Sequence, residues 1–255
     1  MSTLAEWLEG RPFTLALSAG FFGFFAHAGF LTLLAERGLV PRRIVGVSAG
    51  ALAGGLFAAG IAPAVLRDEL FSLRKEDFWD PGPYPDGLLA GRKFAERLAA
   101  ILGPARPAGA LAVPFASVAF DLFARRTVVL SEDIPLDLAI RASCAVPIMF
   151  RPVRAGGRLL VDGGIADRAG LCALAPDEPT LLHYLPSKSP WRRLFRTARA
   201  PVPTRAPWRL VSTQAPRVGP NRLENGPAAF EAAYARAAAA LDAPGGPWAG
   251  AAGPA

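Results

Sequence analysis

Residues 46–50 read Gly-Val-Ser-Ala-Gly, a G-x-S-x-G spacing that can make Ser48 a nucleophile. The short β-branched run 43–45 precedes this segment and the Ala/Leu-rich run 51–59 follows it, which predicts a buried strand, a sharp turn and a helix. A serine at such a turn lies at the positive end of the helix, with its hydroxyl above the sheet. Gly46 and Gly50 are small enough to avoid clashes there. The pattern therefore predicts nucleophilic catalysis of acyl transfer by Ser48.

A serine nucleophile needs a base, and the sequence offers two arrangements. Asp162 closes the apolar stretch 158–162 and is followed by Gly163 and Gly164, which places it at a strand tip where it could take the serine proton directly. Alternatively, Asp162 could orient His183, completing a triad in the chain order serine, aspartate, histidine. The residue pattern leaves both arrangements open.

The donors that stabilise the oxyanion are predicted in the glycine-punctuated loop 19–24. This loop follows the first predicted strand and opens the first predicted helix. Its backbone N–H groups should therefore gather at the carboxyl edge of the sheet, beside Ser48. The phenylalanines of the loop would make an apolar mouth that suits acyl chains.

The elements that must position these groups alternate along the chain. Strands are expected at 13–18, 43–47, 113–120, 126–130, 158–162 and 179–185, and helices at 26–37, 49–59, 62–74, 91–102, 135–143 and 227–242. This alternation predicts an α/β fold with a largely parallel sheet covered by helices on both faces. We expect one domain over 13–242, an N-terminal extension over 1–12, and a disordered Gly/Pro/Ala-rich tail over 243–255.

Composition narrows the function classes further. With 255 residues, 52% of them hydrophobic, the chain can bury a full core. Cys144 and Cys172, with only His27 and His183 beside them in the sequence, predict neither a disulfide framework nor a zinc site, and no cofactor is expected. The uncharged stretch 13–34 is long enough to span a bilayer, but its glycines and change of periodicity favour a strand, a loop and a helix. Because no secretory leader is evident at the start of the chain, we predict a cytoplasmic location.

The net charge of +7 lies entirely in the C-terminal part of the chain. Residues 1–185 hold 18 basic and 18 acidic residues, whereas residues 186–255 hold 10 basic and 3 acidic ones. This asymmetry, concentrated in the basic segment 186–222, indicates an anionic surface as a partner. Nucleic acid is not expected, because no recognised nucleic-acid-binding module accompanies the arginines. No oligomeric state is inferred.

Residues 189–199 have the composition of an interfacial helix. Trp191, Leu194 and Phe195 fall at i, i+3 and i+4, with arginines on the remaining faces. The segment is therefore a candidate for peripheral contact with an anionic membrane. A surface helix that the same three apolar residues dock on the domain explains the pattern equally well.

Several separate blocks of this sequence resemble the bacterial patatin-like phospholipases. They are residues 17–31, the segment 46–50, and residues 141–147 followed by 157–164, with supporting similarity at 78–81, 87–89 and 119–122. The likeness is clearest over 13–185 and runs in unbroken order.

The resemblance implies a serine acyl hydrolase that cleaves fatty-acyl esters of phospholipids or lysophospholipids. Ser48 matches the nucleophile of the family, and Asp162 matches the aspartate of its D-G-[GA] motif, as the base of a serine–aspartate dyad. Since the family uses no catalytic histidine, the resemblance favours the direct base over the triad. It also implies that His183 is structural and that His27 makes a packing or polar contact in the first helix.

The chain departs from the family in the oxyanion loop. The family pattern is G-G-x-x-[RK]-G, whereas residues 19–24 read A-G-F-F-G-F, with Gly23 in place of the basic residue and Phe24 in place of the last glycine. The backbone donors of Gly20 and Phe21 can still form the hole. What is lost is a cation that could steady the loop or a phosphate. An acyltransferase or thioesterase on the same scaffold, or a catalytically weak lipid-binding protein, are therefore alternatives to the lipid hydrolase.

Overall fold

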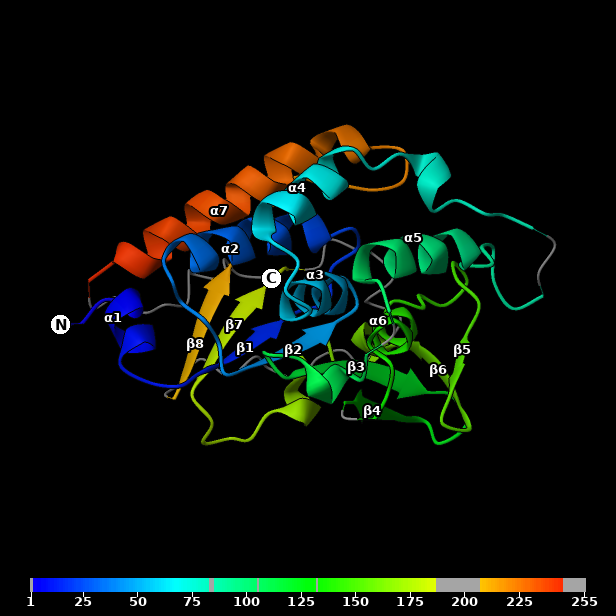
Figure 1. The fold of residues 1–255 in the computed structure, drawn as a ribbon, viewed down its shortest axis with the longest axis horizontal. Helices are drawn as coiled ribbons and strands as arrows, with labels where there is room; N and C mark the ends of the chain where they lie inside the picture. Colours follow the sequence, from blue (N-terminus) through cyan, green and yellow to red (C-terminus); the bar gives the residue numbers. More distant parts are fainter. Residues whose placement is uncertain (1, 83–84, 105, 132, 187–206, 245–255) are drawn as a thin grey trace.

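The computed structural model describes residues 2–82, 85–104, 106–131, 133–186 and 207–244, and within these ranges eight strands form one mixed sheet (Figure 1). The strands are β1 (Thr14–Leu17), β2 (Arg43–Val47), β3 (Phe115–Asp121), β4 (Arg126–Leu130), β5 (Val153–Ala155), β6 (Arg158–Asp162), β7 (Thr180–Tyr184) and β8 (Trp208–Ser212). Their order is β5-β6-β3-β2-β1-β7-β8, and β4 pairs with β3. The pairs from β3 to β8 along this order are parallel, and β4, β5 and β6 pair antiparallel.

Helices flank this sheet. The α-helices are α1 (Leu4–Glu9), α2 (Phe24–Glu36), α3 (Ala49–Ala58), α4 (Pro63–Phe71), α5 (Arg92–Leu102), α6 (Leu136–Ser143) and α7 (Gly226–Asp242). Single-turn 3-10 helices are η1 (Lys75–Asp77), η2 (Ala108–Ala110), η3 (Gly163–Ile165), η4 (Leu171–Ala173) and η7 (Leu223–Asn225). Figure 1 shows α2, α3, α4 and α7 on one side of the sheet, with α7 lying along the outer side of α2.

Successive side chains of a strand point to opposite faces of the sheet. In the central strands, side chains on both faces are packed against other parts of the protein. Leu15 and Leu17 of β1 pack into the main core with the α-helices. Val45 and Val47 of β2 face the other way and pack against Ala173 and Leu174, in and directly after η4. The expected α/β class, with a mostly parallel sheet flanked by helices, is confirmed.

The outer layer depends on one close approach of two helix backbones. A Cβ atom on Gly29 of α2 would lie 2.1 Å from the carbonyl oxygen of Phe230 in α7. Any side chain at this position would push α7 away from α2. Phe230 itself is buried in the main core, so this contact helps to close that core.

The predicted elements agree with the structure to within a few residues, and the stretch 13–34 divides into β1 and α2. No helix of the described ranges is both long and apolar enough to cross a bilayer. Besides the 3-10 helices, three short elements of the described residues were not predicted: α1, β5 and β8. Helix α1 lies in the predicted N-terminal extension, yet its Leu4, Trp7 and Leu8 are buried in the main core. The predicted helix 189–199 and residues 245–255 of the predicted tail lie outside the described residues.

Strands β2 and β6 meet end to end along one edge of β3. Val118 of β3 pairs with both Val47 of β2 and a residue of β4, so β2 and β4 occupy opposite edges. Ala119, the next residue of β3, pairs with both β4 and Asp162 of β6, so β6 shares the edge of β2. Because β6 runs antiparallel to β3, its last residue arrives beside the last residue of β2. This junction brings Asp162 to the residue that follows β2, Ser48.

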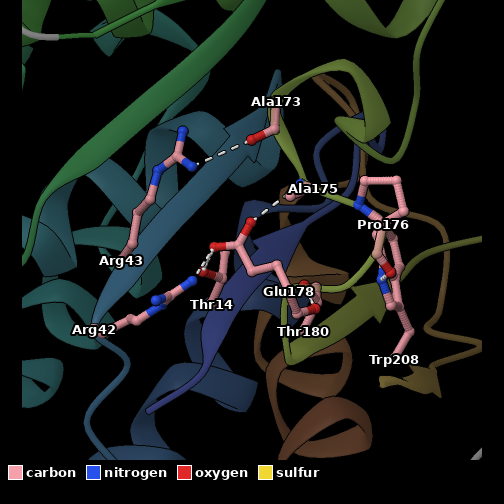
Figure 2. Close-up of polar contacts among 9 residues, drawn as sticks. All are labelled: Thr14, Arg42, Arg43, Ala173, Ala175, Pro176, Glu178, Thr180 and Trp208. Carbon is pink, nitrogen blue, oxygen red and sulfur yellow. Dashed lines mark hydrogen bonds and ion pairs between the residues drawn. The ribbon is translucent and has the colours of Figure 1, made fainter. Parts of the chain in front are cut away.

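A polar cluster connects the amino-terminal ends of the parallel strands, at the end of the sheet opposite Ser48 (Figure 2). The buried carboxylate of Glu178 accepts hydrogen bonds from the Thr14 hydroxyl, from Arg42 Nη2 at 2.7 Å and from the Ala175 N–H at 3.2 Å. Burial raises the pKa of Glu178, but these hydrogen bonds outweigh it and hold the pKa below its ordinary value. The ionised carboxylate therefore helps to fix β1, the start of β2 and the approach to β7.

Candidate active site

Ser48 occupies a strained turn between β2 and α3. Its φ of 53° and ψ of −118° are unusual for a residue with a side chain, and its carbonyl accepts the first helical hydrogen bond, from Leu52 N–H at 3.0 Å. A Cβ on Gly46 would lie 2.5 Å from the Cα of Ala51, and one on Gly50 would lie 2.2 Å from a backbone oxygen of β1. The turn therefore requires both glycines of the G-x-S-x-G segment.

The end of α6 supports this turn from the side. The Ser48 N–H donates to Ser143 Oγ at 2.9 Å, and the Ser143 hydroxyl donates to the Val118 carbonyl at 2.6 Å. The Cys144 thiol donates to the Ser48 carbonyl at 3.1 Å. Burial, with the nearby Asp162 charge, raises the pKa of Cys144, which keeps this cysteine a neutral thiol. Sequence reasoning assigned neither residue a role, although both lie in the block 141–147.

Asp162 ends β6 with its carboxyl group against the Ser48 side chain. One carboxylate oxygen accepts the Gly164 N–H at 2.7 Å, and only 5% of the residue is exposed. Burial raises the pKa of Asp162 to about 6; hydrogen bonds from Ser48 and Gly164 and the charge of Arg168 act in the opposite direction. The carboxylate is thus mostly ionised at neutral pH and basic enough to accept a proton. A Cβ on Gly163 would lie 2.3 Å from the Val118 carbonyl, so the tip also requires its glycine.

The loop after β1 turns tightly beside Ser48. The Gly23 N–H donates to the Gly20 carbonyl at 2.9 Å, and Phe22 has a φ of 52°. Within the described residues, the N–H groups of Gly20 and Phe21 donate to no protein acceptor. Both residues line the same cavity as Ser48, which makes their N–H groups candidates for binding an oxyanion.

A side chain at the family's basic position in this loop would have to displace the Leu185 side chain. A Cβ on Gly23 would lie 2.5 Å from Leu185 Cδ1. A cation nevertheless reaches the loop from the segment after Asp162. Arg168 Nη2 donates to the Ala19 carbonyl at 2.7 Å and to the Leu185 carbonyl at 2.9 Å. Sequence reasoning missed Arg168, because no local pattern in the sequence points to these two carbonyls.

An apolar cavity of about 140 Å³ extends from Ser48 between α3, α4 and α5. Its apolar lining includes Phe22, Leu52, Leu70, Phe78, Leu98 and Phe150. Charged groups also line it: Arg97 lies 2.7 Å from the Glu69 carboxylate and 3.8 Å from that of Asp77. The Ser48 side chain therefore borders an apolar space that also holds a charged cluster at its wall.

The rings of His27 and His183 form a hydrogen bond with each other. Their other hydrogen bonds go to groups other than Ser48 and Asp162. Their Nδ1 atoms are 2.9 Å apart, His27 Nε2 lies 2.8 Å from the Ser18 carbonyl, and His183 Nε2 lies 2.9 Å from the Thr213 hydroxyl. Since a carbonyl only accepts, His27 donates through Nε2, His183 donates through Nδ1, and Thr213 donates to His183.

Both histidine rings are fully buried, which holds them neutral. Burial lowers the pKa of His27 to about 4 and, with the neighbouring His27, lowers that of His183. Of the two bases that the sequence left open, the structure thus places only Asp162 against Ser48. No group of three potential metal ligands occurs within the described part of the chain.

Comparisons with known proteins agree on one family. Residues 15–172 match the Patatin model, described as patatin-like phospholipase. An uncharacterized NTE family protein of Mycobacterium tuberculosis (strain ATCC 25618 / H37Rv) is 36% identical over 168 residues, which are 63% of this chain and 45% of that protein. A second such protein of the same strain is 29% identical over 168 residues, which are 64% of this chain and 28% of that protein. The chain therefore spans less than half the length of these curated relatives.

A solved structure shares the fold. The crystal structure of VipD from Legionella pneumophila superposes with a TM-score of 0.59 at 13% sequence identity. The match covers 90% of this chain and 67% of that one. At this identity the likeness concerns the fold alone.

Proposed function

Because this chain belongs to the patatin-like phospholipase family, we propose that it is a serine acyl hydrolase that cleaves fatty-acyl esters of phospholipids or lysophospholipids. The contact between the Ser48 side chain and the Asp162 carboxyl group carries the proposal, together with the apolar cavity that Ser48 lines. A nucleophile and a base in contact beside a hydrophobic space are the parts that ester hydrolysis of a lipid requires.

The first half of the reaction acylates the serine. Ser48 Oγ attacks the ester carbonyl carbon while the hydroxyl proton passes to the Asp162 carboxylate. The N–H groups of Gly20 and Phe21 stabilise the negative charge on the carbonyl oxygen. The tetrahedral intermediate collapses, the ester bond breaks, and the leaving alcohol takes the proton from Asp162.

The second half releases the fatty acid. Asp162 accepts a proton from water as the water oxygen attacks the acyl-serine, and Ser48 recovers that proton when the new intermediate collapses. The acyl chain remains in the apolar cavity through both halves, which holds the carbonyl against the nucleophile.

A fluorophosphonate probe and a short-chain ester test this proposal directly. The wild type should be labelled and should hydrolyse the ester, the Ser48→Ala variant should do neither, and the exposed control Ser72→Ala should behave like the wild type. Unchanged labelling of Ser48→Ala would refute Ser48 as the nucleophile. Supplying an alcohol acceptor beside water then separates hydrolysis from acyl transfer, because each acceptor gives its own product.

A further inference from the structure

Two hairpin turns lie side by side at one end of the sheet. One, at 122–125, joins β3 to β4, and the other, at 156–157, joins β5 to β6. Asp121 at the end of β3 pairs with Leu160, and the Leu122 N–H donates to the Leu159 carbonyl at 2.9 Å. Since β6 runs antiparallel to β3, both turns must lie at the same end. We call residues 122–126 and 154–158 the hairpin tip.

The hairpin tip exposes apolar and basic side chains together. Phe123 is 71% exposed and Leu122 is 39% exposed. The exposed basic members are Arg125, Arg126, Arg154 and Arg158. As far as the described residues go, none of these four arginines takes part in an ion pair.

The one acidic residue at this end of β3 is turned inward. Asp121 is buried, and its carboxylate accepts the N–H groups of Phe123 and Ala124 at 2.9 and 3.1 Å. Those hydrogen bonds fix the turn that raises Phe123 from the surface. The charge that the hairpin tip presents outward is therefore positive, around an exposed aromatic ring.

We propose that the hairpin tip docks on the surface of an anionic lipid bilayer. The arginines would bind headgroup phosphates, and Phe123 with Leu122 would enter the interfacial layer. Moving an exposed phenylalanine from water into this layer lowers the free energy of the bound state. The phenylalanine thus adds to the binding that the arginines provide. This proposal rests on the proposed function, because a hydrolase of membrane lipids must reach the bilayer that holds its substrate.

Strand β6 connects this surface to the dyad. It begins in the hairpin tip at Arg158 and ends at Asp162. Four residue steps along a strand span about 13 Å, so docking would bring the dyad close to the lipid headgroups. The hairpin tip and Asp162 therefore both lie toward the carboxyl-terminal end of β3.

Co-sedimentation with vesicles tests the docking, in a Ser48→Ala background so that no lipid is cleaved. Vesicles of phosphatidylcholine alone are compared with vesicles of phosphatidylcholine and phosphatidylserine. Arg125→Gln with Arg158→Gln should weaken binding to the anionic vesicles about 30-fold at low salt. The exposed pair Arg37→Gln with Arg67→Gln removes the same charge elsewhere and should have little effect.

The apolar part has its own comparison. Phe123→Ser should weaken binding to anionic vesicles, whereas Val40→Ser, at a residue 65% exposed before β2, should not. Equal losses in test and control variants would overturn the proposal, as would binding to neutral vesicles alone. Loss of duplex DNA binding in the tip variants, without vesicle binding by the parent, would assign the surface to nucleic acid instead.

Failure of docking and failure of the enzyme remain distinguishable. Hydrolysis of a soluble short-chain ester, measured with Ser48 intact, should be unchanged by Phe123→Ser and by the arginine pair, and thermal unfolding should match the parent. An active enzyme whose tip variants bind normally refutes docking alone. An inactive protein that binds through the hairpin tip refutes the hydrolase and leaves docking standing.

Discussion

Arg168 and Ala19 are joined by two hydrogen bonds in opposite directions. The Arg168 guanidinium donates to the Ala19 carbonyl at 2.7 Å, and the Ala19 N–H donates to the Arg168 carbonyl at 2.8 Å. The start of the loop 19–24 is therefore attached to the segment that follows Asp162. This loop has Gly23 where the family has a basic residue. Arg168, from a distant part of the chain, nevertheless places a cation beside it.

The Arg168→Met variant should lower kcat for a soluble ester by about ten- to a hundredfold with little change in KM. Full loss of one oxyanion donor lowers the rate about 10²–10³-fold, and a loosened loop should lose part of that. Because Arg168 also lowers the pKa of Asp162, the activity midpoint should move to higher pH. Arg168→Lys is the control, since it keeps the charge and should keep the midpoint. An unchanged kcat and pH profile in Arg168→Met would show that the loop needs no such support.

Ser48→Ala and Asp162→Asn should each remove ester hydrolysis while the fold is kept. The first removes the nucleophile and the second the proton acceptor, and such losses commonly exceed about 10⁴-fold in kcat. Steady-state hydrolysis and circular dichroism measure both effects. His183→Gln, which retains hydrogen-bonding capacity, should remain active when folded. Loss of activity in a folded His183→Gln variant would contradict the direct base and favour the triad, in which Asp162 orients His183.

The rate of ester hydrolysis should rise with pH through a midpoint near 6. Burial raises the pKa of Asp162 to about 6, and only its ionised form accepts the serine proton. The profile of kcat/KM against pH gives this value for the free enzyme. A midpoint near the ordinary aspartate value of 3.8 would contradict the buried base.

Asp162→Asn should stabilise the protein at neutral pH. A carboxyl group whose pKa is raised on folding binds more protons when folded, so its contribution to the free energy of unfolding is present below about 3.8 and is lost as pH rises through about 6. A neutral amide avoids that loss, which amounts to as much as about 3 kcal/mol at about 1.4 kcal/mol per pKa unit. Urea unfolding at pH 7 and pH 4 checks it, with a clearly larger gain expected at pH 7 than at pH 4.

Glu178→Gln should destabilise the fold by about 1–3 kcal/mol at neutral pH, because it weakens a buried set of charge-assisted hydrogen bonds. The folded pKa of Glu178 lies below its ordinary value, so this stabilisation is present above pH 4.5 and declines as pH falls below it. Chemical unfolding across this range should show a weaker acid dependence in the variant. The exposed Glu9→Gln serves as the control, and identical curves for the two variants would contradict the prediction.

Site residues whose position is set by their neighbours in the sequence could be predicted from the sequence. The turn at Ser48 follows from Gly46 and Gly50, since no side chain fits at either position, and Asp162 follows from the strand and glycines around it. Arg168 could not be predicted, because its hydrogen bonds go to carbonyls 17 and 149 residues away.

The missed elements are short and depend on tertiary contacts. Strand β8 has five residues in a basic segment and pairs only with β7, and β5 has three residues and pairs only with β6, within the part of the chain that the structure describes. Helix α1 begins at a capping box in which Thr3 and Glu6 bond each other, a signal that the charged N-terminal segment obscured.

The end-to-end meeting of β2 and β6 makes chain length a strict requirement at the dyad. Both strands take their register from β3, so inserting or deleting one residue within Arg158–Asp162 would shift the Asp162 carboxylate by about 3.3 Å and reverse the face to which it points. The hairpin turn at 156–157 is under no such restriction. Length changes compatible with catalysis should therefore accumulate in that turn, leaving the five residues that follow it fixed in number.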